Sequence, residues 1–245
     1  MAQRLKLIVA YDGAAFEGWQ SQRSGNTVQD RLEQAFGRVI GERVRIHGAG
    51  RTDAGVHALG QCAHLDVSRK LPPARWAAAV NSHLPPAVRV LRCGYVDNLF
   101  HARYAAKAKV YRYRIWNAAI LPPFEYCRSW HLPGPLNFDR LRDAARVLEG
   151  RHDFRAFGAN RRKLREDTVR TIFKVKAQRR GAELSLEFEG DGFLYKMVRL
   201  MVGEVVRCAQ GKQALSVISQ RLKTPFAHAR FVSPACGLIL VRVRY

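Results

Sequence analysis

Residues 5–13 read LKLIVAYDG, and residues 27–39 read TVQDRLEQAFGRV. The first stretch is apolar and β-branched and closes on an Asp-Gly turn signal, which predicts a strand ending at Tyr11. In the second stretch, Thr27 followed by Asp30 is typical of a helix amino terminus, and apolar residues recur at helical spacing. The chain therefore opens with a strand followed by a helix.

The same analysis extends through the first half of the chain. Strands are predicted over residues 43–47, 61–67 and 88–96, and a mostly helical stretch over residues 71–84. A glycine-rich connection separates the first two of these strands. The first half is therefore predicted to be β-α-β-β-α-β.

The second half repeats this order of elements without a residue-level repeat. Its predicted elements are a strand over 109–116, a helix over 138–148, a hairpin of 169–178 with 183–189, a helix over 193–209 and a final strand over 238–243. The predicted class is α+β: two split β-α-β domains, ferredoxin-like or RNA-recognition-like, with antiparallel sheets joined around a central active-site cleft. A boundary near residues 100–107 gives domains over 1–105 and 106–245.

The charge balance points to a polyanionic partner. Lys and Arg number 42 against 20 Asp and Glu, a formal net charge of +22 at pH 7. Such a surface repels itself unless a polyanion shares it, and nucleic acid is the obvious candidate, although some ribosomal and membrane-surface proteins are equally basic. No apolar run approaches the roughly 20 residues of a membrane span, and the apolar stretch ending at Ala10 is too short for a signal peptide. We therefore expect a cytoplasmic protein without membrane contact.

Cysteine and histidine usage predicts neither a disulfide framework nor a metal site. The five cysteines are scattered singly: Cys62, Cys93, Cys127, Cys208 and Cys236. Zinc and iron-sulfur sites use close pairs, and an odd count does not suit a disulfide framework. His57 and His64 have no carboxylate or thiol at ligand spacing, so structural or surface roles are expected for them.

The segment with the strongest chemical signal is residues 48–58, GAGRTDAGVHA. Three glycines within eight residues permit unusual backbone conformations and close approach to a ligand. Asp53 is the single acid of the segment and lies two residues after Arg51. By itself the pattern also fits a loop in which Asp53 bonds its own backbone and the glycines form tight turns.

Motifs along essentially the full chain resemble those of the tRNA pseudouridine synthase A family. They are residues 49–57 (AGRTDAGVH), 11–13, 18–20, 27–29, 60–61, Asn81 with 84–85, 100–103 (FHAR), Lys109, Tyr111 and Tyr113, 153–154, 170–172, 197–199 and 237–238. The resemblance implies isomerisation of uridine to pseudouridine at positions 38, 39 and 40 of the tRNA anticodon stem-loop. It also implies a homodimer that needs neither metal nor cofactor.

Asp53 is the nucleophile that the resemblance implies. The reaction detaches the base from the ribose and rejoins it through carbon without a change of oxidation state, so a redox cofactor has no role. A carboxylate suits this chemistry because it can attack a sugar or a base and be expelled again, or stabilise positive charge at the anomeric carbon. Attack on the sugar, attack on the base and removal of a sugar proton all remain open.

Two further residues are expected to handle the RNA. The target base must be flipped out of its stack, and the guanidinium of Arg51 is suited to stack on neighbouring bases and hold phosphates; a solvated surface Arg is the alternative. By resemblance Tyr111 meets the uracil, and strand alternation places it on the same face as Tyr113. A core tyrosine is the alternative for Tyr111 and the expected role of Tyr113.

Arg199 and Leu238 complete the expected site. Arg199 falls in a stretch that is apolar nearly all round a helix, so a partly buried guanidinium there needs an acidic partner. The resemblance supplies Asp53, and pairing would keep that acid ionised. Leu238 would pack beneath the flipped base, or serve simply as a core leucine.

The basic run at residues 161–165, RRKLR, is either a solvated loop or a contact to the tRNA backbone.

Two other functions fit parts of the pattern. A non-catalytic RNA-binding module would need no paired Asp53 and Arg199, and the standard aromatic RNA-recognition signature is missing. A phosphate-binding or glycosidic enzyme would suit the glycine-rich loop, but that loop lacks the Gly-Lys-Ser/Thr ending of a phosphate loop.

Overall fold

The structure, a computed structural model, describes residues 2–159, 167–224 and 228–245. The chain forms two compact units: unit 1 comprises residues 1–107 and 239–245, and unit 2 comprises residues 108–238. Unit 2 is thus inserted into the sequence of unit 1. The expected division assigns residues 239–245 to the second half, whereas here they belong to unit 1.

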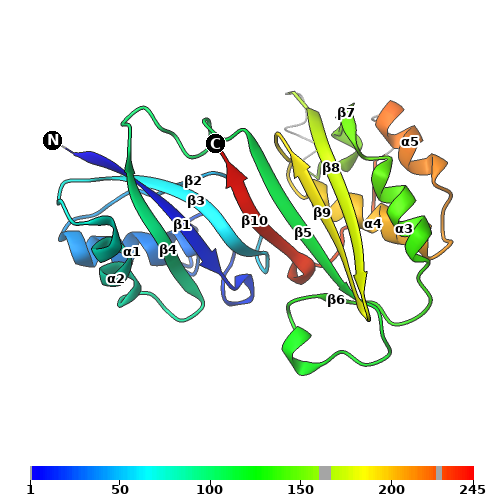
Figure 1. The fold of residues 1–245 in the computed structure, drawn as a ribbon, viewed down its shortest axis with the longest axis horizontal. Helices are drawn as coiled ribbons and strands as arrows, with labels where there is room; N and C mark the ends of the chain where they lie inside the picture. Colours follow the sequence, from blue (N-terminus) through cyan, green and yellow to red (C-terminus); the bar gives the residue numbers. More distant parts are fainter. Residues whose placement is uncertain (1, 160–166, 225–227) are drawn as a thin grey trace. The chain divides into compact units, whose positions relative to one another are not determined.

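Unit 1 is a sheet with two helices on one face (Figure 1). Its elements are β1 (Gln3–Tyr11), η1 (Gly13–Ala15), α1 (Val28–Ile40), β2 (His47–Gly48), β3 (His57–Val67), α2 (Pro73–Asn81), β4 (Val88–Val96) and most of β10 (Leu238–Arg244). β1 lies between β4 and β3 and is antiparallel to both. β2 pairs with the far part of β3, and β10 runs parallel to its beginning.

Alternation along β1 gives the sheet of unit 1 two different faces. Leu5, Leu7 and Val9 are completely buried on the face covered by the helices. Arg4 and Lys6 flank Leu5 in the sequence and are only half-buried, so they belong to the opposite face. This second face combines charged side chains with a small apolar cluster that includes Ile8 and Cys62, whereas the first face is apolar.

α1 begins where the sequence predicts. The backbone N–H of Asp30 donates to the hydroxyl oxygen of Thr27 at 3.2 Å, which caps the helix. The strand predicted over residues 43–47 is wrong except at its end, because only residues 47–48 pair with β3. β3 is longer than predicted and starts at His57.

Unit 2 contains an antiparallel sheet in the order β5-β9-β8-β7, with the short strand β6 parallel to β5. Its elements are β5 (Ala108–Trp116), η2 (Pro123–Glu125), β6 (Trp130–His131), α3 (Phe138–Arg146), β7 (Gly150–Asp153), η3 (Arg155–Phe157), β8 (Val169–Arg180), β9 (Glu183–Gly190), α4 (Met197–Ala209), α5 (Ser216–Lys223) and η4 (Ala235–Gly237). The predicted hairpin is confirmed, with Gly181 at φ 59° in its turn. The predicted α+β class is also confirmed.

The helix predicted to start at residue 193 begins four residues later, at Met197. Lys196 has φ 59°, a left-handed conformation that a right-handed helix cannot include. The ring of Phe193 packs edge-on against Tyr111 with centroids 5.1 Å apart. Arg199 therefore lies in the first turn of α4 and not in the middle of an apolar helix.

Candidate active site

The loop that carries Asp53 spans residues 49–56, between β2 and β3 of unit 1. The side-chain Nε2 of Gln61 on β3 donates to the main-chain oxygen of Gly50 at 2.8 Å. Further along, the N–H of Val56 donates to the main-chain oxygen of Asp53 at 3.1 Å. Both halves of the loop are therefore fixed by hydrogen bonds, and the half-buried side chain of Asp53 starts from a defined backbone.

Thr52 anchors the loop immediately before Asp53. Its hydroxyl oxygen lies 2.8 Å from the hydroxyl oxygen of Tyr11 on β1, within the core. Its main-chain oxygen accepts from the N–H of Trp19 at 3.1 Å. Burial raises the pKa of Tyr11 to about 12, so the phenol stays protonated and available for this hydrogen bond.

Two glycines allow neighbouring backbone to pack against the loop. A Cβ on Gly18, whose φ is 96°, would lie 2.6 Å from the main-chain oxygen of Thr52. A Cβ on Gly13 would lie 2.1 Å from the main-chain oxygen of Val56. Any side chain at these positions would displace the Asp53 loop. In the sequence, Gly13 and Gly18 stand out only as members of motifs. The close backbone packing that requires glycine there is a tertiary contact, which the sequence does not display.

Arg51 lies at the surface of the same loop and is exposed. Its Nε donates to the side-chain oxygen of Gln20 at 3.2 Å. Gln20 in turn donates from Nε2 to the side-chain oxygen of Gln29 on α1 at 2.9 Å. An oriented cation and a half-buried carboxylate are therefore presented two residues apart.

Tyr111 and Tyr113 lie on one buried face of β5 in unit 2, as the alternation predicts. Tyr111 is 7% exposed and contacts the ring of Phe193. Tyr113 is completely buried, and its hydroxyl donates to the main-chain oxygen of Pro234 at 2.8 Å. Burial raises the pKa of the Tyr113 phenol. Tyr113 thus has the core role expected for it.

Arg199 is bound to the segment that precedes η4. Its Nε donates to the main-chain oxygen of Ser233 at 2.8 Å. Ser233 is completely buried, and its N–H and hydroxyl donate to the main-chain oxygen of Arg199 at 3.2 and 2.9 Å. Ser233 carries no sequence signal, because a lone serine in a loop looks the same whether or not it orients an arginine.

Leu238 follows directly after this segment and is 6% exposed. A Cβ on the preceding Gly237 would lie 2.7 Å from the ring of Tyr113, so the chain passes against β5 here. Contacts within unit 2 thus link Tyr113, Arg199 and the residues just before Leu238. Asp53 and Arg51 belong to unit 1.

Across residues 2–159, 167–224 and 228–245, no group of three or more His, Cys, Asp or Glu side chains could hold a metal ion. In those same ranges no helix is both long and apolar enough to cross a membrane. The basic run at residues 161–165, expected to be either a solvated loop or a contact to the tRNA backbone, lies outside the described residues.

Comparison with known proteins gives a consistent result. A family model described as tRNA pseudouridine synthase matches residues 7–105 and 144–245. Proteins named tRNA pseudouridine synthase A are 43% identical in Akkermansia muciniphila, 42% in Geobacillus kaustophilus and 40% in Methylacidiphilum infernorum. These matches cover 98–100% of this chain and 94–95% of the relatives. The chain belongs to the tRNA pseudouridine synthase family.

Proposed function

We propose that this protein isomerises uridine to pseudouridine at positions 38, 39 and 40 of the tRNA anticodon stem-loop. The observation that carries the proposal is the Asp53 loop. It presents a half-buried carboxylate on a backbone fixed by Gln61 and Thr52, beside the exposed cation of Arg51. A fixed nucleophile next to a group that holds RNA suits an enzyme acting on one nucleotide of a larger RNA.

The isomerisation needs one carboxylate and no net oxidation. The bond from the ribose C1′ to N1 of uracil breaks, the base turns, and a bond forms from C1′ to C5. The proton on C5 is lost and N1 gains a proton, so substrate and product are isomers. Asp53 would either attack C1′, attack the base, or remove a sugar proton, and each route uses its ionised form.

The remaining site residues have supporting roles in the proposal. Arg199, oriented by Ser233, would pair with Asp53 and keep it ionised. Tyr111, held by Phe193, would meet the uracil, and Leu238 would pack beneath it. Arg51 would occupy the space vacated by the flipped base.

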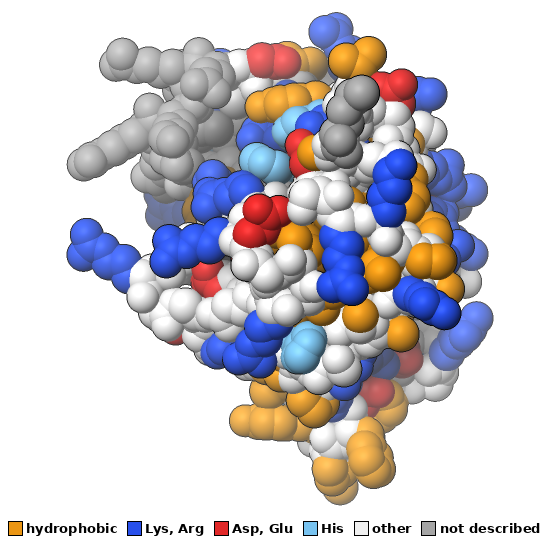
Figure 2. Space-filling model, turned by 90° about the vertical axis from the view of Figure 1, so that its left-hand side faces the viewer, with side chains coloured by type: hydrophobic (Ala, Val, Ile, Leu, Met, Phe, Trp, Pro, Cys, Tyr) orange, Lys and Arg blue, Asp and Glu red, His pale blue; other side chains and the backbone are white. Residues whose placement is uncertain are grey.

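The surface charge supports a polyanionic substrate. The net charge of +22 is carried by a chain of 245 residues. Figure 2 shows Lys and Arg side chains spread over the face viewed there, with fewer Asp and Glu side chains among them. Such a surface favours RNA binding that weakens steeply with added salt.

We further propose a homodimer, and a loop of unit 2 offers a surface for it. Ile120, Phe124 and Tyr126 are 80%, 88% and 69% exposed. Exposed apolar side chains that lie together often mark a protein interface. Sedimentation equilibrium should show that the wild-type protein is a dimer and that Phe124→Glu weakens its association. A wild-type protein that is a monomer at micromolar concentration would overturn the proposal.

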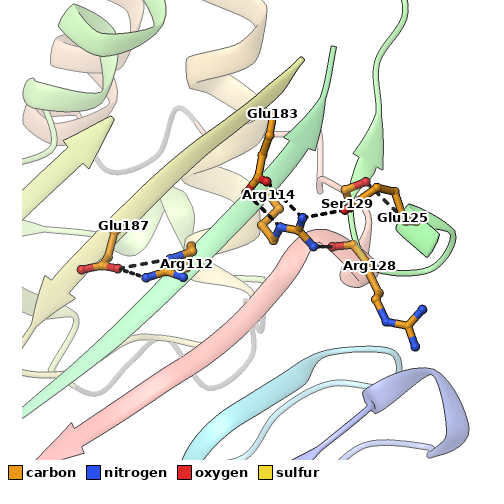
Figure 3. A network of polar contacts seen from close by, with 7 residues as sticks. All are labelled: Arg112, Arg114, Glu125, Arg128, Ser129, Glu183 and Glu187. Carbon is orange, nitrogen blue, oxygen red and sulfur yellow. Dashed lines mark hydrogen bonds and ion pairs between the residues drawn. The ribbon is translucent and has the colours of Figure 1, made fainter. Parts of the chain in front are cut away.

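The loop that bears these side chains is held by partly buried ion pairs and a hydrogen bond of Arg114 (Figure 3). Arg114 on β5 donates from Nη2 to Glu125 at 2.9 Å and from Nε to Glu183 on β9 at 3.1 Å. Its Nη1 also donates to the main-chain oxygen of Arg128 at 3.3 Å. The loop is therefore ordered before any partner binds.

The activity is tested with a tRNA transcript that carries tritium on C5 of uridine. The full chain should release tritium to water, because C5 loses its hydrogen in the reaction. Transcripts with cytidine at position 38, 39 or 40 identify the modified positions. A transcript that keeps its tritium and its uridine content throughout would overturn the proposed activity.

A further inference from the structure

A row of stacked rings crosses the face of the unit 1 sheet that carries Arg4 and Lys6. His47 on β2 and His64 on β3 stack with ring centroids 5.1 Å apart. His101 meets His64 edge-on at 4.7 Å and packs on Tyr104 at 4.3 Å. The row runs from the buried His64 to Tyr104, whose side chain is 77% exposed.

The turn that presents Tyr104 is fixed by two imidazoles that act as acceptors. His101 Nδ1 accepts from the backbone N–H groups of Arg103 and Tyr104 at 3.2 and 3.4 Å. His64 Nδ1 accepts from the N–H of Ala102 at 3.2 Å. Burial lowers the pKa of both histidines, that of His64 to about 4, so both remain neutral acceptors near pH 7. An aromatic side chain ordered in this way loses little entropy when it binds.

A basic side chain accompanies the exposed end of the row. The guanidinium of Arg103 lies 5.7 Å from the centre of the Tyr104 ring and is exposed. An exposed ring beside an exposed cation is the composition that binds unpaired nucleotides, because every base has a π face and every linkage a phosphate.

We propose that Tyr104 is a stacking platform for an unpaired base of the substrate RNA, with Arg103 contacting an adjacent phosphate. The inference rests on the proposed function for its substrate, tRNA. It adds a second contact on the unit that carries Asp53: β2, which bears His47, leads directly into the catalytic loop. This contact contributes affinity and takes no part in the chemistry.

The test measures binding of the full chain to an unmodified tRNA transcript. Tyr104→Ala should weaken the Kd about tenfold, since a stacked base contributes on the order of 1–3 kcal/mol. Tyr104→Phe keeps the ring and should bind within about twofold of wild type. The matched control is Leu99→Ala, which removes a side chain that is 92% exposed in the same segment. It should leave the Kd unchanged.

Salt dependence separates stacking from charge. Arg103→Ala should lower the slope of log K against log salt by about one, whereas Tyr104→Ala should lower K without changing the slope. The single-turnover rate at saturating tRNA should stay at the wild-type value in both variants. A Tyr104→Ala protein with wild-type thermal unfolding and wild-type Kd would overturn the proposal, and so would an altered oligomeric state with unchanged Kd.

A crosslink needs no variant and is therefore independent of folding effects. Transcripts containing 4-thiouridine should crosslink under long-wave light to the peptide that contains Tyr104, and unlabelled tRNA should compete. Failure to recover that peptide, when other peptides crosslink, would overturn the platform. If wild-type protein forms no pseudouridine yet Tyr104→Ala weakens binding and the crosslink appears, the proposed activity fails and the platform stands.

Discussion

Arg199 and Ser233 hold each other by hydrogen bonds in both directions. The arginine donates from Nε to the serine carbonyl at 2.8 Å, and the serine N–H and hydroxyl donate to the arginine carbonyl. Bonding at Nε fixes the plane of the guanidinium. These contacts within unit 2 therefore orient the cation.

Replacement of Arg199 should reduce activity even when charge is kept. Arg199→Lys cannot donate from Nε or grip a carboxylate with two nitrogens, so we expect a loss of at least about 100-fold in single-turnover rate, and a larger loss for Arg199→Ala. Arg142→Lys, at an exposed ion pair on α3, is the control.

A double-mutant cycle tests whether Asp53 and Arg199 act together. If they share one site, the penalties of Asp53→Asn and Arg199→Ala in single-turnover rate should not add, since the second change removes what is already lost. Simple additivity would show that the two residues act independently. Additive penalties would rule out their proposed pairing but would leave the separate role of each residue unaffected.

Asp53→Asn should abolish turnover and preserve binding. The change removes the ionised oxygen and keeps the shape, so we expect a rate loss above about 1000-fold with tRNA affinity within about tenfold of wild type. Asp143→Asn, at an exposed carboxylate on α3, controls for loss of charge. Appreciable activity in Asp53→Asn protein free of wild-type enzyme would remove Asp53 from the nucleophile role.

Tyr111→Phe separates packing from chemistry. The ring that contacts Phe193 at 5.1 Å is retained, and the hydroxyl is lost. Binding should stay nearly intact while the single-turnover rate falls by about tenfold or more, if the hydroxyl assists the reaction. A wild-type rate would assign Tyr111 to packing alone. Tyr113→Phe is the comparison, and it should affect stability instead because its hydroxyl binds Pro234.

Glu204 should be a major contributor to the stability of unit 2. It is 2% exposed on α4, and its carboxylate accepts from Arg221 at 2.5 Å and Gln213 at 2.8 Å. Glu204→Ala removes this carboxylate from its buried ion pair with Arg221, which should lower the free energy of unfolding by about 3–5 kcal/mol. Urea unfolding measures the loss. Glu187→Gln, at a more exposed pair with Arg112, should cost under about 1 kcal/mol.

His64 should make the protein less stable in mild acid. Burial, followed by nearby positive charge, lowers its pKa from 6.5 to about 4 in the folded state. The unfolded chain therefore takes up this proton first as pH falls, and stability is lost between about pH 6.5 and pH 4. The contribution between pH 7 and pH 5 is about 2 kcal/mol. His64→Asn should flatten that part of the unfolding free energy against pH; an unchanged pH dependence would contradict the assignment.

The sequence predicted local structure well where local interactions decide it. α1 has its cap at Thr27 and its buried stripe in neighbouring residues, so both signals lie within a few positions. At α4 the same apolar pattern extends too far upstream, because Phe193 packs against Tyr111 and does not lie along a helix. Hydrophobic periodicity indicates which residues pack against others, but it does not distinguish packing within a helix from packing of a segment that precedes one.

The residues of the candidate site also differ in whether the sequence predicts them. Asp53, Arg51 and Tyr111 stand in motifs that the sequence displays. Gly18 and Ser233 act through contacts with residues more than 30 positions away, and nothing in their immediate surroundings indicates this. Residues that position a site are harder to predict than those that perform its chemistry, since they are selected by tertiary geometry.

The return of residues 239–245 to unit 1 has a consequence for protein synthesis. Ile239 and Leu240 pair with His57 and Ala58 on β3, just after the Asp53 loop. A ribosome must therefore translate all of unit 2 before the strand next to the catalytic loop receives this partner. Until then that strand edge is open to other chains, a state in which chaperones protect nascent proteins. An incompletely translated chain can fold much of unit 1 but cannot finish it, so modification of RNA would start only once translation is complete.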